Sequence, residues 1–157
     1  RYQIAVLREP ESRGGSTAMH DAIAVGDLLH ISAPRNHFPL SGDAPFHLLL
    51  AGGIGITPLL AMAEQLSAAG QPFALHHCTR SRARTPFLAH IAASPFAGNT
   101  QHHFSTGDGS RRLDLAATLA EGETVRLVMT NDLTCNVEGI ATPCPEHDEG
   151  PVEVPAE

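Results

Sequence analysis

From residue 46 onward, short segments with the length of strands alternate with longer stretches in which apolar residues recur every three or four positions. The predicted strands lie at 46–51, 73–79, 100–105 and 125–129, and the first and last of them contain apolar runs. The stretches between them predict helices at 57–69, 84–93 and 113–120. This order predicts an α/β fold in which a parallel sheet carries helices on both faces.

The first 45 residues follow a different pattern. Apolar residues predict strands at 2–7 and 28–32, separated by a loop at 8–16 and a helical turn at 18–24. A Pro- and Gly-rich connection at 33–46 then predicts a boundary between two lobes.

Charge separates the end of the chain from the rest. The net charge is −7, and residues 121–157 hold nine of the acidic residues but one Arg. Apolar periodicity fades beyond residue 131, and four Pro follow residue 134. We therefore predict an acidic, irregular tail over 132–157.

Composition excludes several classes of function. No basic patch indicates a nucleic-acid partner, and no apolar stretch reaches the roughly 20 residues of a membrane span. The N-terminus has no signal-peptide pattern. Three cysteines do not make a disulfide scaffold, so a cytoplasmic location is predicted.

The segment 47–69 places a glycine turn between a buried strand and a helix. Thr57 suits the N-cap of that helix, and Pro58 suits its first position. The unpaired N–H groups of the helix end would then favour a phosphate at the carboxyl edge of the sheet. Because Pro58 replaces the last glycine of G-x-G-x-x-G, an ordinary tight strand-to-helix turn is the alternative.

Three motifs together resemble one family. They are the turn GGIGITP at 52–58, the segment RGGS at 13–16 and the segment APRNHFPL at 33–40. This combination resembles the phthalate dioxygenase reductase family, which includes the vanillate demethylase reductases, within the ferredoxin-NADP reductase-like superfamily. The resemblance runs from Tyr2 to about Leu119.

The resemblance implies a partial antiparallel FMN-binding β-barrel over 1–43 and an NAD-binding α/β domain over 44–131, followed by the tail at 132–157. In the family, electrons pass from NADH through FMN and a plant-type [2Fe–2S] centre to a partner oxygenase. The resemblance thus implies that the protein is a flavin-dependent NADH oxidoreductase, whose partner is an oxygenase or a ferredoxin-type electron acceptor.

The resemblance also assigns flavin-binding residues in the first lobe. It places a strand along the flavin and a turn on its phosphate, with the matching residues Ile4, Ala5, Val6, Gly14, Gly15 and Ser16. Small residues in succession can form a nest of N–H donors for an anion. An ordinary Gly-Gly-Ser hairpin loop is the alternative.

In the second lobe, Gly53, Gly55 and Thr57 match the turn on the nicotinamide side, with the Thr57 hydroxyl at the site of hydride transfer. Helix capping is the alternative role for Thr57. Thr79 and Arg80 match a pair near the ribose and phosphates of NAD. The alternative for Arg80 is a solvated arginine at a strand end.

Two arginines, Arg82 and Arg84, follow this pair and could favour a 2′-phosphate. They could equally lie at a helix start. The resemblance favours NADH.

Histidine pairs at 76–77 and 102–103 suggest a metal site, but strand neighbours point to opposite faces and cannot easily chelate one ion. The cluster CPEHDE at 144–149 lies in a Pro-rich acidic segment. We predict no metal site at either place.

Three features of the family are missing. The sequence has no Arg-x-Tyr-Ser, no Cys-Gly-Pro, and only three cysteines where a plant-type cluster needs four. We therefore expect a truncated member or fragment. The alternatives are an NAD-binding remnant without turnover and, more weakly, an interaction module that uses the acidic tail.

Overall fold

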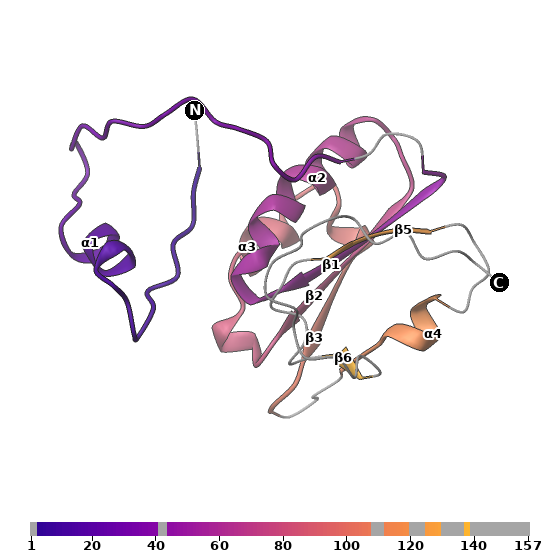
Figure 1. The fold of residues 1–157 in the computed structure, drawn as a ribbon. Helices are drawn as coiled ribbons and strands as arrows, with labels where there is room; N and C mark the ends of the chain where they lie inside the picture. Colours follow the sequence, from indigo (N-terminus) through magenta and orange to yellow (C-terminus); the bar gives the residue numbers. More distant parts are fainter. Residues whose placement is uncertain (1–2, 41–43, 108–111, 120–124, 130–136, 139–157) are drawn as a thin grey trace. The chain divides into compact units, whose positions relative to one another are not determined.

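A computed structural model of the chain describes residues 3–40, 44–107, 112–119, 125–129 and 137–138 (Figure 1). The chain divides into two compact units, Arg1–Pro39 and Leu40–Glu157. The division falls inside the Pro- and Gly-rich segment 33–46. The two units are described separately.

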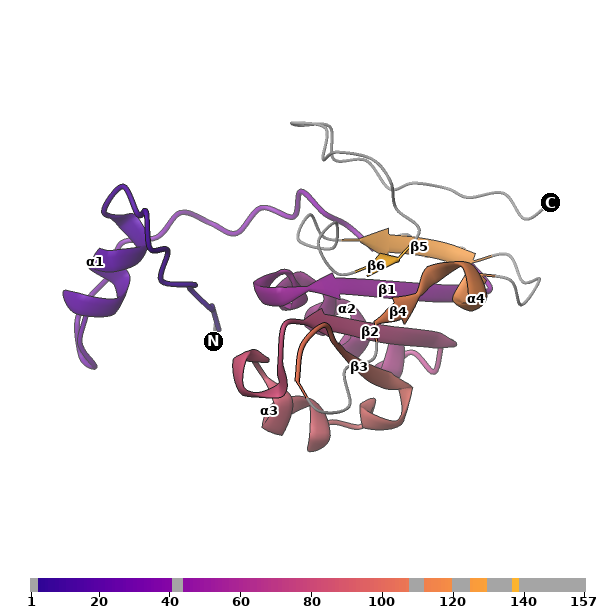
Figure 2. The same cartoon turned by 90° about the horizontal axis from the view of Figure 1, so that it is seen from below.

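The second unit is built on a parallel sheet of four strands in the order β3-β2-β1-β5. Their bounds are β1 Phe46–Gly52, β2 Phe73–Thr79, β3 Thr100–Phe104 and β5 Val125–Met129. All three strand pairs are parallel, with β1 between β2 and β5 (Figure 2). The predicted α/β fold and its four strands are confirmed to within a residue. In β1, the buried apolar run leaves few alternatives to a parallel strand.

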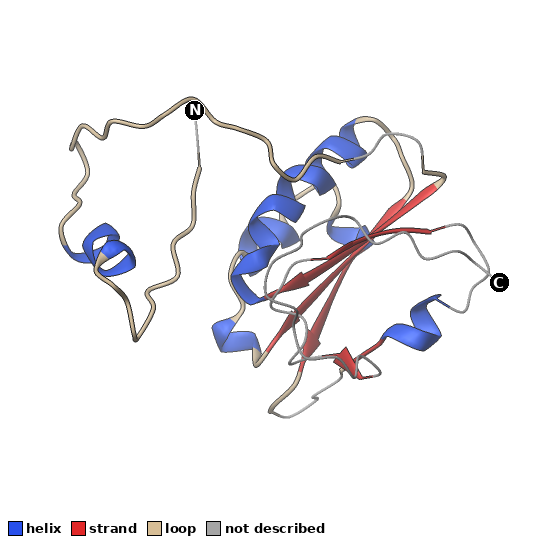
Figure 3. Cartoon of the chain, viewed as in Figure 1, coloured by secondary structure: helices blue, strands red, loops and turns tan. Residues whose placement is uncertain are grey.

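Helices and short turns connect the strands (Figure 3). They are η1 Gly53–Gly55, α2 Ile56–Ala68, η2 Arg82–Arg84, α3 Leu88–Ala92, η3 Ala97–Asn99 and α4 Leu115–Leu119. The helix predicted at 84–93 begins late because Phe87, just before α3, has a left-handed φ of 61°. Pro86 also disfavours helical backbone at the residue before it.

The region predicted as a helix at 113–120 opens with a short strand, β4 Leu113–Asp114, before α4. β4 pairs in parallel with β6 Val137–Glu138. At the start of α4, the Asp114 carboxylate accepts a hydrogen bond from the Ala117 N–H at 2.9 Å. Asp114 therefore caps this helix, which explains why the helical backbone starts after it.

The two faces of the sheet carry different layers. α2 and α3 lie on one face, and α4 lies on the other (Figure 1). On the α4 face, Leu48, Leu50, Cys78 and Leu113 form a buried cluster. Alternation along β1 puts the fully buried Leu49 on the α2 face. Helices on both faces agree with the prediction.

The first unit contains one helix, α1 Gly15–Asp21, and no strand among residues 3–39. The strands predicted at 2–7 and 28–32 are therefore wrong for this structure. A strand is stabilised by hydrogen bonds to a neighbouring strand, and the described part of this unit offers none. Large apolar side chains stay exposed as a result: Ile4, Leu7, Val25, Leu28, Leu29 and Ile31.

Polar contacts hold α1 in place. Arg8 forms an ion pair with Asp21 at 2.7 Å, and His20 Nε2 donates to the Val6 carbonyl at 2.8 Å. None of the α1 side chains is buried. The helix begins at Gly15, three residues before the predicted start at Ala18, because Gly14 takes a left-handed φ of 107° as its N-cap.

None of the helices described is long and apolar enough to cross a membrane.

Candidate functional site

The candidate site lies at the carboxyl edge of the parallel sheet. β1 lies between β2 and β5. The strands that follow β1 in sequence are therefore added first on one side of it, as β2 and β3, and then on the other side, as β5. In open α/β sheets, ligands bind outside the carboxyl ends of the strands at such a reversal of strand order. The glycine turn that follows β1 is located there.

The glycine turn continues directly into the helix. Gly53 has a left-handed φ of 48°, and η1 leads without a break into α2. The N-cap of α2 is Gly55, and no side chain caps the helix. The prediction that Thr57 is the N-cap is therefore wrong: the η1 turn takes up the helical backbone two residues earlier. Pro58 then lies within the first turn, where its missing N–H costs no hydrogen bond.

Thr57 is half-buried in the first turn of α2. Since its hydroxyl is not used as a cap, the role implied by the resemblance, contact with the nicotinamide, remains a prediction for Gly53, Gly55 and Thr57. The structure does bring these three residues together at one end of α2.

A buried histidine ties the turn to the neighbouring strand. His77 of β2 is fully buried, and its Nε2 lies 3.1 Å from the Gly53 carbonyl oxygen. Burial lowers the pKa of His77 to about 4, an effect that the Gly53 carbonyl opposes and nearby His102 reinforces. At neutral pH the ring is uncharged, so Nε2 carries the proton and donates to the carbonyl.

The end of β2 lies beside the turn, since Gly52 is in register with Cys78. Thr79 is buried, whereas Arg80 is exposed. The Arg80 carbonyl accepts hydrogen bonds from the N–H and hydroxyl of Thr106, at 2.9 and 2.8 Å. These bonds fix the backbone of Arg80, while its guanidinium is left at the edge of the sheet.

The Thr79 side chain is committed inward. Its hydroxyl lies 2.6 Å from the Thr85 hydroxyl, which donates to the Ser81 carbonyl. Thr79 therefore holds the loop that carries the exposed Arg82 and Arg84 of η2. Its predicted contact with the nucleotide would go through backbone atoms unless this bond opens.

The residues predicted to bind flavin lie in the first unit. The Ser16 hydroxyl donates to the Ser12 hydroxyl at 2.9 Å and accepts from the Glu9 N–H at 3.2 Å. A Cβ built on Gly14 or Gly15 meets nothing within 4 Å. The turn is open and satisfied by its own neighbours, so the described residues of this unit do not form a flavin cradle by themselves.

The backbone of Ile4, Ala5 and Val6 does not form a strand in the structure. Their predicted place along a flavin is not supported by the geometry of this unit, because a flat strand surface is what would contact the ring. Their role as flavin-binding residues remains a prediction.

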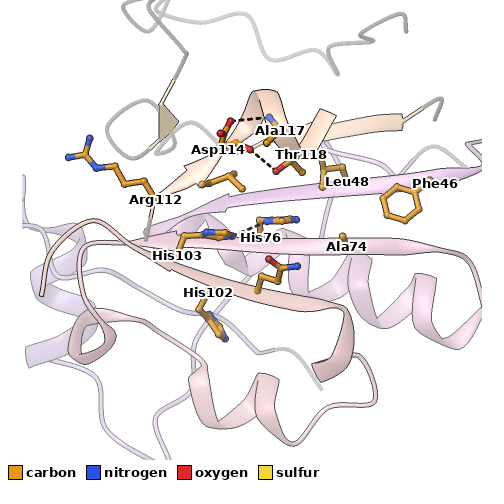
Figure 4. Close-up of a pocket in the computed structure, with 12 residues that line it drawn as sticks. Phe46, Leu48, Ala74, His76, His102, His103, Arg112, Asp114, Ala117 and Thr118 are labelled. Carbon is orange, nitrogen blue, oxygen red and sulfur yellow. Dashed lines mark hydrogen bonds between the residues drawn. The ribbon is translucent and has the colours of Figure 1, made fainter. Parts of the chain in front are cut away.

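A pocket lies on the α4 face of the sheet, separate from the glycine turn (Figure 4). This pocket has a volume of about 620 Å³ and is lined by residues of four strands and of α4. At its floor, His76 Nδ1 lies 2.9 Å from His103 Nε2, and the two rings stack with centroids 5.1 Å apart. Burial lowers the pKa of His76.

Consecutive histidines point to opposite faces, as predicted. His76 contacts His103 on the α4 face, whereas His77 contacts Gly53 and lies against His102. Figure 4 shows His102 on the opposite side of β3 from His103. No group of three or more potential metal ligands converges within the described residues.

Comparison with known proteins complements this geometry. No protein-family model matches the chain. Vanillate O-demethylase oxidoreductase of Pseudomonas sp. is 47% identical over 119 residues, which are 76% of this chain and 38% of that protein. Phthalate dioxygenase reductase of Burkholderia cepacia is 41% identical over 115 residues, 73% of this chain and 36% of that protein.

The crystal structure of phthalate dioxygenase reductase, described as a modular structure for electron transfer from pyridine nucleotides to [2Fe–2S], superposes with a TM-score of 0.72. It is 34% identical and covers 79% of this chain, which in turn covers 39% of that chain. The chain belongs to the phthalate dioxygenase reductase family. The chain spans well under half the length of the curated relatives that it matches.

A longer chain of known structure is also similar to this one. An intact type IV self-sufficient cytochrome P450 monooxygenase has a TM-score of 0.72 and 40% identity. It covers 83% of this chain, which covers 17% of that chain. This chain is therefore similar both to a reductase and to part of a much longer monooxygenase chain.

Sequence reasoning missed His77, Thr85 and Thr106 as parts of this edge. His77 was the one with a signal: a polar residue inside a fully buried strand needs a hydrogen-bond partner. Thr85 and Thr106 gave no comparable signal, because hydroxyl residues are ordinary in loops.

Proposed function

We propose that this chain is the nucleotide-binding portion of an oxygenase reductase, which takes electrons from NADH through FMN towards a [2Fe–2S] centre and a partner oxygenase. The observation that carries the proposal is the glycine turn at the reversal of strand order, in a chain 41–49% identical to such reductases. Hydride donation is the chemistry that the nicotinamide supplies when it is bound.

The residues at the carboxyl edge suit a dinucleotide. Gly53 and Gly55 let a ligand approach the backbone closely, and the N–H groups that open α2 favour a phosphate. The exposed Arg80 at the end of β2 can pair with a second phosphate or contact the ribose. Thr57, in the first turn of α2, would position the nicotinamide. No acid or base is needed, because the protein orients the reactants.

The flavin part of the proposal is supported by family membership and not by the geometry of the first unit. Gly14, Gly15 and Ser16 remain the candidates for its phosphate. The cysteines of this chain are too few for a plant-type cluster, so that centre belongs to another domain or protein in the proposal.

A second candidate, NAD binding without turnover, is favoured by one observation. The first unit has no strand in its described part and exposes large apolar side chains. Such a unit would leave the nucleotide site intact while failing to hold a flavin.

Anaerobic mixing of the chain with FMN and NADH separates the two candidates. Bleaching of the flavin absorbance above a protein-free control would support the reductase. NADH binding without bleaching, in a chain shown to be folded, would support the nucleotide-binding candidate. Absence of NADH binding would contradict both.

A further inference from the structure

We infer that His77 is a positioning residue of the glycine turn: its Nε2–H holds the Gly53 carbonyl and so sets the direction in which the turn presents its N–H groups. The consequence for ligand binding rests on the proposed nucleotide-binding function. The hydrogen bond itself does not.

The bond joins two elements that are far apart in the sequence. His77 and Gly53 are 24 residues apart, and the His77 side chain has an exposed fraction of 0%. His77 faces Ala51 across the β1–β2 register, two residues before Gly53. The imidazole thus reaches up along the sheet to the first residue after β1.

The His77 ring makes one hydrogen bond, from Nε2 to the Gly53 carbonyl. With Nε2 donating to Gly53, Nδ1 must carry the lone pair, and it is buried with no hydrogen-bond partner among the described residues. His102 lies against the ring with centroids 5.6 Å apart, and Arg82 lowers the pKa of His102 in addition to burial. Burial, reinforced by His102, lowers the pKa of His77 to about 4, so the ring is neutral at physiological pH and the Gly53 carbonyl selects its Nε2–H tautomer.

The geometry of the peptide unit converts this bond into an orientation. A trans peptide is planar, so the Ile54 N–H points opposite to the Gly53 carbonyl. Glycine has broad backbone freedom, and Gly53 is held at a left-handed φ of 48°. Without the His77 bond, the turn would sample other orientations, and a ligand would have to pay the entropy of ordering it.

A purely space-filling role for His77 makes a different prediction. His77→Phe keeps an aromatic ring in the core but removes the donor, whereas His77→Gln keeps a donor at a similar distance from the backbone. His76→Phe is the matched control, because His76 is the adjacent residue, is also buried in β2, and points to the other face.

The experiment measures the Kd for NADH by fluorescence titration of the full chain and its three variants, after each is shown to unfold cooperatively. We expect His77→Phe to raise the Kd about three- to tenfold, the effect of one hydrogen bond. His77→Gln should restore the Kd to within about twofold, and His76→Phe should stay within about twofold of the unmodified chain.

Two nucleotide-free measurements test the bond independently. Long-range ¹H–¹⁵N NMR should show the His77 ring as the Nε2–H tautomer. Amide hydrogen exchange at Ile54 and Gly55 should accelerate in His77→Phe but not in His76→Phe.

The Nδ1–H tautomer, or unchanged exchange in His77→Phe, would overturn the inference. So would an NADH Kd unaffected by His77→Phe, or one weakened equally by His76→Phe. Failure of the unmodified chain to bind NADH would instead overturn the proposed function, and the NMR and exchange results would still decide the role of His77.

Discussion

The two units of this chain treat similar apolar residues in opposite ways. In the second unit, Leu49 and Leu59 are fully buried. In the first, Leu28 has an exposed fraction of 94% and Ile31 of 69%. Both units contain runs that predict strands, but only the second supplies neighbouring strands and a covering helix.

The difference shows that an apolar run acquires structure from its partners. β1 is paired on both sides and covered on both faces, so every residue of the strand after Phe46 is buried. Each fully buried Leu contributes roughly 1.5–3 kcal/mol of transfer free energy. The first unit has no equivalent gain, because its one helix buries no residue.

The largest expected effect contrasts one leucine from each unit. Leu49→Ala should lower the free energy of unfolding by about 2–5 kcal/mol, because it leaves a cavity beneath α2. Leu28→Ala should change it by less than about 0.5 kcal/mol, since the side chain is already in water. Urea denaturation followed by circular dichroism measures both. Equal losses from the two variants would mean that the first unit is buried in solution.

A smaller effect concerns the pH dependence of the second unit. His77 has a pKa of about 4 when folded and 6.5 as the ordinary value, so the unfolded chain binds its proton first as the pH falls. The contribution of neutral His77 to the free energy of unfolding is fully present above pH 6.5. It is lost progressively as the pH falls from 6.5 to 4. The loss is about 3 kcal/mol at the low end.

His77→Phe should remove this share of the pH dependence, and urea denaturation at pH 7 and pH 4.5 would reveal it. The comparison of the variant with the unmodified chain cancels the contributions of other titrating groups. Parallel pH profiles for the two proteins would contradict the buried, neutral state of His77.

The smallest effect compares two left-handed glycines. Gly53→Ala should cost about 1–2 kcal/mol of unfolding free energy, because an L side chain at a φ of 48° is strained. Gly14→Ala introduces at least as much local strain, because a φ of 107° lies outside the left-handed α region. Because no residue of α1 is buried, we expect Gly14→Ala to reduce the helix content of α1 without shifting the main unfolding transition. A matching shift of the transition midpoint by Gly14→Ala would show that the two units unfold together.

The strands of the second unit could be predicted because local pattern and tertiary environment agree. The run Leu48-Leu49-Leu50 is apolar at every position, as a strand buried on both faces requires. The same local signal at 28–32 failed, because nothing in the sequence of a strand tells whether its partners are present. Patterns predict what a segment can become, and pairing decides whether it does.

The candidate site was predictable to the level of the turn and not of its contacts. The glycines at 52–55 indicated the turn directly, since few other residues permit it. The cap was misassigned to Thr57 because a short 3₁₀ turn can precede an α-helix without altering the sequence pattern. The His77–Gly53 bond depends on the register of β1 against β2, which no local pattern encodes.

The strand order also has a consequence for synthesis on the ribosome. β1 ends at Gly52, but β5, which pairs with its second edge, begins at Val125. At roughly 5–20 residues per second, that edge waits several seconds for its partner after it leaves the ribosome. During this interval the nascent chain displays an unpaired strand edge that carries consecutive leucines, which is a surface for a chaperone to cover.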